Sequence, residues 1–144
     1  MQYAHPLKRL AAWLIDALLL TLVGKALQLS LRPLFPPQGI AGERSYYHLV
    51  LLGTIVLISF LYFMLMNGSR RYRGTIGKMA LGISVVNHGG HHIGFSQAIV
   101  RTLAGILSII PLGAGFIMIA YNPQRRALHD LISDSWVINK PYYF

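Results

Sequence analysis

The stretch LVLLGTIVLISFLYFMLM, Leu49–Met66, runs for 18 consecutive residues without a charge and decides the class of this protein. Its few small or polar residues are scattered, so it has no polar face of the kind that a helix on the surface of a soluble protein shows. A helix of roughly 20 residues crosses the hydrocarbon core of a bilayer, which is about 30 Å thick. The stretch therefore predicts a transmembrane helix over about 48–66 and an integral membrane protein.

Two other apolar stretches are long enough to cross. Leu10–Leu31 is interrupted by Asp16 and Lys25, and Ala98–Tyr121 carries Arg101 as its one charge. They predict helices over about 7–31 and 96–121, and hence an all-α membrane protein with about three transmembrane helices. The first stretch follows basic residues as a secretory signal does, but Asp16 breaks it and no small-x-small cleavage site ends it cleanly, so we expect it to be retained.

The third stretch contains a sequence break at Pro111, followed by Gly113 and Gly115. The break leaves halves of about 13 and 10 residues, or roughly 20 and 15 Å of helix, and neither half crosses a bilayer alone. One kinked helix fits this pattern, because proline and glycine are common in membrane helices. A re-entrant hairpin also fits, provided that its bend is buried in protein or lines a cavity. Both alternatives stay open.

The composition excludes several classes of protein. Of 144 residues, 54% are hydrophobic and 12% are charged, which is too few charges for the surface of a soluble domain and too much apolar content for a disordered chain. The length fits a single domain over residues 1–144. No cysteine is present, so disulfides, thiolate metal sites and a cysteine nucleophile are excluded.

The charges are mostly basic, with 13 Lys and Arg against 4 Asp and Glu. With the N-terminus inside, three crossings distribute the basic residues almost evenly, whereas a chain whose C-terminus returns inside has 10 inside and 3 outside. The positive-inside rule favours the second arrangement in the inner membrane, with segments of about 67–95 and 122–144 in the cytoplasm. The basic excess is thus a signal of topology, and we expect no nucleic acid partner.

Two short stretches in these segments, Gly82–Val86 and Ser135–Ile138, have the composition of β-strands. Isolated strands are stable only when paired. We therefore expect them to meet in a small cytoplasmic lobe, with the glycine-rich stretch Val86–His92 forming a turn between the first strand and a short one near Ile93.

Asp16 is the most informative residue, because a carboxylate inside an apolar helix is costly and must face protein or water. Arg9 lies two turns earlier and leans away from it, so a direct pair between them is not expected. We predict Arg101 as the partner of Asp16, with Lys78 second. Arg9 is left to bind a lipid phosphate or the carboxylate of Asp130.

Other polar groups give weaker signals. His88, His91 and His92 lie close together but lack a supporting carboxylate, so we expect a solvated turn and no metal site. His129 precedes Asp130 and can orient it. No catalytic motif is present, so we expect neither an enzyme nor a cofactor. A basic stretch directly after the second apolar helix predicts contact with anionic lipid headgroups through Arg70, Arg71 and Arg73.

Three motifs occur together in order: LKRLAAWLID (Leu7–Asp16), GTIGKMALGI (Gly74–Ile83) and RRALHDLI (Arg125–Ile132). In this combination the chain resembles the RDD family of small membrane proteins over about Leu7–Ile138. The arginine and two aspartates that name the family match Arg9, Asp16 and Asp130. The sequence Ser133-Asp134-Ser135 departs from the family pattern after its last aspartate, which leaves the role of Asp134 open.

The resemblance implies transport of cations and protons or of a small solute, with Asp16 as carrier, Arg9 tuning that carboxylate and Asp130 closing the cytoplasmic side. Three helices do not enclose an aqueous path, so such a transporter needs a homo-oligomer or a partner. The alternative is an accessory or scaffold subunit of a larger membrane complex, in which the same three residues are structural latches.

Overall fold

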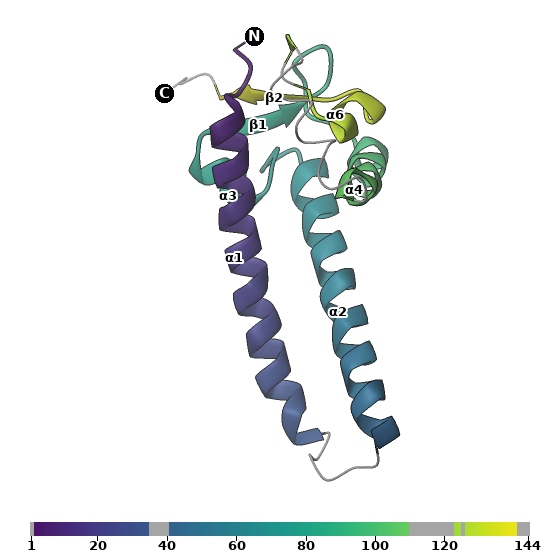
Figure 1. Ribbon diagram of the computed structural model, residues 1–144. Coiled ribbons are helices and arrows are strands. Elements are labelled where there is room, and N and C mark those ends of the chain that lie inside the picture. The colour runs from purple at the N-terminus through teal and green to yellow at the C-terminus, as the bar shows by residue number, and fades with distance from the viewer. Residues whose placement is uncertain (1, 35–40, 110–122, 125, 141–144) are drawn as a thin grey trace.

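The computed structural model describes residues 2–34, 41–109, 123–124 and 126–140, with the side chains of 41–45 and 107–109 left aside. Two long helices, α1 (Pro6–Leu31) and α2 (Ala41–Gly68), stand side by side, and a small lobe covers the end where α1 begins and α2 finishes (Figure 1). A short 3₁₀ helix, η1 (Arg32–Leu34), follows α1 at the opposite end. Proline at the first position of α1 has no N–H to leave unpaired, and His5 caps the helix by accepting a hydrogen bond from the Leu7 N–H at 3.3 Å.

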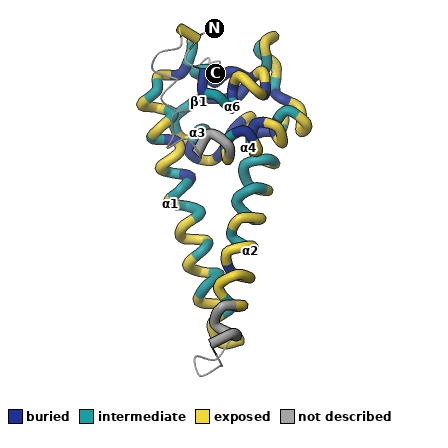
Figure 2. Tube along the Cα trace, turned by 45° about the vertical axis from the view of Figure 1, so that its right-hand side comes forward, coloured by how far each residue is buried: buried dark blue, intermediate teal, exposed yellow. Residues whose placement is uncertain are grey.

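Among the described residues, two helical stretches are long and apolar enough to cross a membrane, Pro6–Leu34 and Tyr46–Gly68. Most of their surface is exposed along the length below the lobe (Figure 2). Leucines such as Leu14, Leu18 and Leu22 are each more than half exposed. Such exposure is unfavourable in water and ordinary in lipid, which is as apolar as a leucine side chain. Both predicted helices are thus present, the second extending N-terminally of its predicted start.

The lobe combines α3 (Ile76–Ala80), β1 (Ile83–Val86), α6 (Leu128–Ile132) and β2 (Trp136–Asn139). The two strands pair antiparallel, with Ile83 opposite Asn139 and Val86 opposite Trp136. The prediction of two paired strands is confirmed, each within one residue of its predicted bounds. A turn follows β1 as predicted, but beyond it the expected strand near Ile93 is reduced to one bridge between Val86 and His92.

The N-terminal residues extend this sheet. Tyr3 forms a bridge with Ile138, the Ala4 N–H donates to the Val137 carbonyl at 3.0 Å, and the Asn139 N–H donates to the Gln2 carbonyl at 3.0 Å. The two ends of the described chain therefore lie together, at the same end of the helical pair (Figure 1). The lobe has a small apolar core consisting of Ala4, Ala12, Ile83, Val85, Ile93, Ala98 and Val137.

Helix α4 (Phe95–Ile109) does not run alongside α1 and α2. It is seen end-on in Figure 1, while the two long helices run vertically, and its first turn packs against the end of α2 at Gly68. Its 15 residues span about 22 Å. The predicted third helix over 96–121 is described only in this part. Its break at Pro111 and the proposed hairpin lie outside the described residues, so a third crossing stays a prediction.

Candidate functional site

Asp16 lies where α1 enters the lobe, and its side chain is almost completely buried, with 1% exposure. One carboxylate oxygen, Oδ1, accepts hydrogen bonds from the Tyr62 hydroxyl at 2.7 Å and from the Gly77 N–H at 2.8 Å. The other, Oδ2, accepts one from the Thr75 hydroxyl. Three neutral donors from α2 and the start of α3 thus satisfy this carboxylate, and it forms no direct ion pair with any residue that the structure describes.

The same bonds hold the start of α3. Thr75 is the N-cap of α3, but its side chain makes no capping bond, and its hydroxyl donates to Asp16. The Ile76 N–H donates to the Tyr62 hydroxyl at 3.0 Å, and the Gly77 N–H donates to Asp16. Asp16 and Tyr62 therefore cap α3 from the two long helices, with a negative charge at the end of the helix where its backbone N–H groups are unpaired.

Gly77 is required by the closeness of this contact. A Cβ at this position would lie 2.1 Å from the Ala12 carbonyl oxygen and 3.1 Å from Asp16 Cγ. Any larger residue would push α3 away from α1 and lengthen the bond from the Gly77 N–H to Asp16. The motif Gly74–Lys78 is thus a docking turn for α1.

The predicted partners of Asp16 lie elsewhere, which corrects the sequence analysis. Arg101 forms an ion pair with Asp130 Oδ1 at 2.7 Å and donates to the Ser135 hydroxyl. Its helix, α4, packs against α6 and the end of α2, so the guanidinium faces α6. The ammonium of Lys78 donates to the Asn67 side-chain oxygen at 3.0 Å. Neither cation forms an ion pair with Asp16 within the part of the chain that the structure describes.

Asp130, on α6, is fully buried and is the centre of the charged network. Oδ2 pairs with Arg9 and accepts the Ala127 N–H at 3.0 Å, while Oδ1 faces Arg101 and, at 3.3 Å, His129 Nε2. Of the two alternatives for Arg9, the structure has the pair with Asp130. Burial alone would raise the pKa of the Asp130 carboxyl, but the guanidiniums of Arg101 and Arg9 outweigh it and hold the pKa below its usual value. The carboxylate stays charged at neutral pH.

Two neighbouring groups are pushed towards their neutral forms. Burial, followed by repulsion from Arg101, lowers the pKa of His129 to about 3, so the imidazole is neutral at pH 7. Burial and the positive charges of Arg101 and Arg9 also lower the pKa of Lys78 well below its usual value. The pKa values of both groups are shifted by the same three charges, those of Arg101, Arg9 and Asp130.

Arg126 is a member of this site that the sequence analysis did not identify. Its Nη2 donates to the Asp130 carbonyl at 3.1 Å and pairs with Asp134 Oδ1 at 3.2 Å, and its Cζ lies 4.0 Å from the centroid of the Trp136 ring. Asp134 is 68% exposed at the side chain and has a positive φ of 45°. It lies in the turn after α6, and its exposed carboxylate forms the ion pair with Arg126 from the solvent-exposed side. Nothing in the sequence of the third motif indicated that Arg126 is buried.

The remaining predicted residues lie apart from the two carboxylates. His88 contacts the Trp136 ring, with centroids 5.1 Å apart, and His92 accepts a hydrogen bond from Arg70 Nε at 3.1 Å. Among the residues described, no group of three His, Asp or Glu side chains is arranged to hold a metal ion. Arg70, Arg71 and Arg73 are exposed in the turn between α2 and α3.

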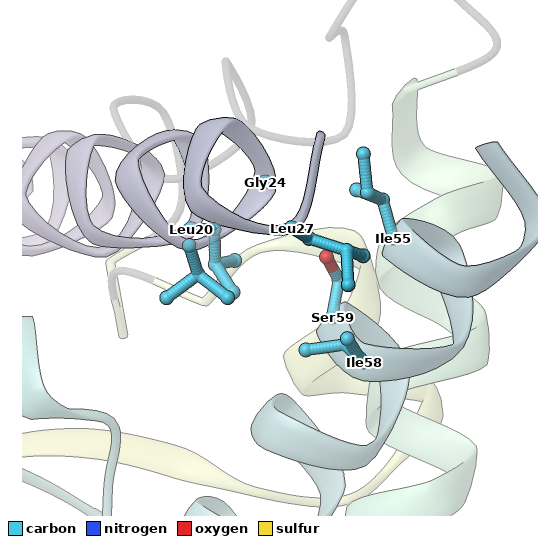
Figure 3. A pocket seen from close by; sticks show the side chains of 7 residues that line it. Leu20, Gly24, Leu27, Ile55, Ile58 and Ser59 are labelled. Atoms are coloured by element: carbon cyan, nitrogen blue, oxygen red, sulfur yellow. The ribbon is translucent and has the colours of Figure 1, made fainter. Parts of the chain in front are cut away.

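A small hollow lies between the two long helices, lined by leucines, isoleucines, Val23, Gly24 and Ser59 (Figure 3). Its volume of about 10 Å³ is room for about one water molecule. None of the residues that line it is charged.

Comparison with known proteins agrees with the motifs. The model of the RDD family matches residues 3–134. "Uncharacterized protein YxaI" of Bacillus subtilis (strain 168) is 40% identical over 99 residues, which are 67% of this chain and 64% of that protein. "Uncharacterized membrane protein YteJ" of the same organism is 30% identical over 91 residues, 62% of this chain and 54% of that protein. No solved structure matches the chain significantly.

The chain spans less than two thirds of the length of either relative. The family match nevertheless covers all three signature residues, Arg9, Asp16 and Asp130, together with the Gly74–Lys78 turn that receives Asp16. Two long apolar helices and a family match over nearly the whole chain lead to one conclusion. This protein is a membrane protein that belongs to the RDD family.

Proposed function

We propose that this chain is a non-transporting accessory or scaffold subunit of a larger membrane complex, and that Arg9, Asp16 and Asp130 latch its lobe to the membrane helices. The observation that carries this proposal is the use of both carboxylates in bonds within the chain. Asp16 holds α3 through three donors, and Asp130 joins α1, α4 and α6 through ion pairs.

The energetics support a latch over a carrier. A carrier carboxylate must release its partners during each cycle, and buried donors left unpaired cost about 1–3 kcal/mol each. Asp16 would leave three donors behind. Asp130 would leave the buried guanidiniums of Arg9 and Arg101 without the carboxylate that they share, and its lowered pKa opposes protonation at neutral pH.

The proposed orientation follows from charge. We place the lobe on the cytoplasmic side of the inner membrane with both ends of the chain inside, because 10 of the 13 basic residues then lie inside. The lobe offers no catalytic constellation among its described residues, so its proposed role is to present a folded surface at the membrane and not to catalyse a reaction.

The test is flux in proteoliposomes that contain the purified full chain and an internal pH-sensitive dye. Sodium or potassium gradients are expected to cause no more proton movement than in protein-free liposomes, with an exchanging ionophore as positive control. In parallel, Asp16→Asn and Asp130→Asn are expected to lower thermal stability. Cation-dependent flux that disappears in a fully stable Asp16→Asn variant would overturn the latch.

A homo-oligomeric exchanger of cations and protons, or a small-solute transporter, is the second candidate. The observation that favours it is the buried ion-pair group of Arg9, Arg101 and Asp130 where the membrane helices meet the lobe. Burial and the charges of the two arginines hold the pKa of Lys78 well below its usual value. In this case Asp16 carries the ion and subunits assemble to form the path. Cross-linking in native membranes separates the two candidates, since an exchanger gives ladders of this chain alone and an accessory subunit gives adducts with a larger protein.

A further inference from the structure

Helix α4 has two faces of different chemistry. Small residues and Arg101 form the buried face, with Ala98 and Ala104 at most 2% exposed and Arg101 at 4%. The opposite face is apolar and open. It consists of four side chains spaced four, four and three residues apart, with exposures of 37–54%: Phe95, Ile99, Leu103 and Ile106.

This arrangement differs from both common kinds of helix. A surface helix of a soluble protein turns its apolar face inward, whereas α4 turns small residues inward and large apolar ones outward. A helix lying in the membrane interface buries its apolar face in the acyl boundary, while its other face contacts water or protein. In its described part α4 lies crosswise at the end of α2 (Figure 1).

A basic turn lies at the same level. Arg70, Arg71 and Arg73 are exposed directly after α2, and the turn is held by a hydrogen bond of 3.0 Å from the Arg73 N–H to the Ser69 carbonyl. The sequence has no acidic residue between Glu43 and Asp130, so no carboxylate near this turn in sequence neutralises it.

One contact joins the turn to the helix. Arg70 Nε donates to His92 Nε2 at 3.1 Å, and His92 lies three residues before Phe95, where α4 begins. Phe95 in turn packs on Gly68, the last residue of α2, since a Cβ there would be 2.8 Å from the Phe95 ring. Positive charge and exposed apolar side chains thus belong to one continuous part of the molecule at the end of a membrane helix.

We infer that α4 and the turn Ser69–Arg73 form a single surface that binds anionic phospholipids, with the apolar face of α4 in the shallow acyl region and the arginines on the headgroup phosphates. The charge of the turn complements anionic headgroups, and juxtamembrane basic residues each raise affinity for them about fivefold. This surface positions the lobe flat on the bilayer, independently of whether the chain transports an ion.

Depth measurement tests the helix. Because the chain has no cysteine, Leu103→Cys can carry a fluorophore alone, with Val56→Cys in the middle of α2 and Ile132→Cys on the lobe as controls that are similarly exposed. Lipids with quenchers near the carbonyl are expected to quench Leu103 most strongly. Quenching from the bilayer centre as at Val56 would instead mean a spanning helix, and quenching as weak as at Ile132 would mean a face outside the lipid; either result overturns the inference.

Lipid preference tests the arginines. Native mass spectrometry of the full chain from nanodiscs with phosphatidylcholine and phosphatidylglycerol is expected to show bound phosphatidylglycerol, with a loss on the order of tenfold in Arg70→Gln/Arg71→Gln. The matched control, Lys25→Gln/Arg32→Gln, removes two exposed charges near the other end of the helices and is expected to keep the preference. Equal losses in both variants, or displacement of the lipid by millimolar inorganic phosphate, would overturn the site. Unchanged melting in pure phosphatidylcholine shows that the variants fold.

Discussion

The Gly77 N–H donates a hydrogen bond of 2.8 Å to the Asp16 carboxylate, at a place where α3 and α1 are too close for any side chain on residue 77. Asp16 in a membrane helix and Gly77, 61 residues later, therefore form one contact that holds α3 against α1. Their relationship predicts how the lobe responds to the smallest possible substitution.

Gly77→Ala is expected to destabilise the protein by at least about 2 kcal/mol, because the new methyl group would overlap the Ala12 carbonyl and force α3 off α1. The measurement is thermal unfolding in detergent, followed by size-exclusion with fluorescence detection. Gly53→Ala is the matched control, since a Cβ at Gly53 meets nothing within 4 Å and alanine favours the helix. Equal melting of the two variants would contradict the close contact.

Asp16→Ala is expected to be more harmful than Asp16→Asn by several kcal/mol. Alanine leaves the Tyr62 hydroxyl, the Thr75 hydroxyl and the Gly77 N–H without their acceptor, and each such group costs about 1–3 kcal/mol. Asparagine keeps an oxygen for two of these donors. Expression level and melting temperature measure the order, and a charge-only role would instead give both variants the same loss.

Asp130→Asn is expected to be worse than Arg9→Gln, because loss of the acid leaves two buried guanidiniums facing each other, whereas loss of Arg9 leaves the pair of Asp130 with Arg101. In a double-mutant cycle the combined variant should lose less than the sum of the single ones. The coupling is expected to be about 1–3 kcal/mol. Additive losses would show that the two residues act separately.

His129 predicts a fall in stability as the medium becomes mildly acidic. Its pKa is lowered from 6.5 to about 3 in the folded protein. Below pH 6.5 the unfolded chain therefore binds a proton at His129 that the folded protein does not bind. Stability is therefore full above pH 6.5 and decreases as pH falls, by at most about 1.4 kcal/mol per pH unit. Between pH 7 and 5 the melting temperature of His129→Gln should depend less on pH than that of the parent.

Asp130 does not affect the pH dependence between pH 7 and 5. A carboxyl with a lowered pKa contributes stability that is lost only below the usual carboxyl pKa of 3.8. A parent and His129→Gln variant with parallel pH profiles between 7 and 5 would mean that His129 titrates normally in the folded protein.

The pairing of the N-terminal segment with β2 predicts the topology of the chain ends. Single cysteines at Gln2 and Asn139, whose backbones are joined by a 3.0 Å hydrogen bond, should react with an impermeant reagent from the same side of sealed vesicles. Arg32→Cys, near the other end of the helices, should react from the opposite side. Labelling of Gln2→Cys and Asn139→Cys from different sides would exclude the sheet in the membrane-embedded protein.

Sequence reasoning was strongest where one physical requirement dominates. The thickness of the bilayer is enough to predict a membrane helix over Leu49–Met66. Short strands are stable only when paired, which made the pairing of Ile83–Val86 with Trp136–Asn139 predictable. The buried acid at Asp16 was identified for the same reason, since hydrocarbon tolerates no unpaired carboxylate.

The predicted partners of Asp16 were wrong because a buried carboxylate can be satisfied by neutral donors and does not require an opposite charge. The donors are two hydroxyls and a backbone N–H, and nothing in the composition of Gly74–Lys78 shows that this turn would lie against α1. The prediction for Arg101 was wrong because its helix, α4, does not run parallel to α1 (Figure 1). A helix lying crosswise carries the same arginine to α6, and a tertiary orientation of this kind is absent from local sequence pattern.

The pair between Arg9 and Asp130 joins residues 121 positions apart, which has a consequence for biosynthesis. During translation Arg9 emerges 121 residues before Asp130, whose carboxylate follows 12 of the 13 basic residues of the sequence. The nascent chain therefore presents an uncompensated positive end to the insertion machinery, which orients the first helix, and only later neutralises that charge. The lobe can therefore close only after Asp130 has been translated, when both long helices have already been made.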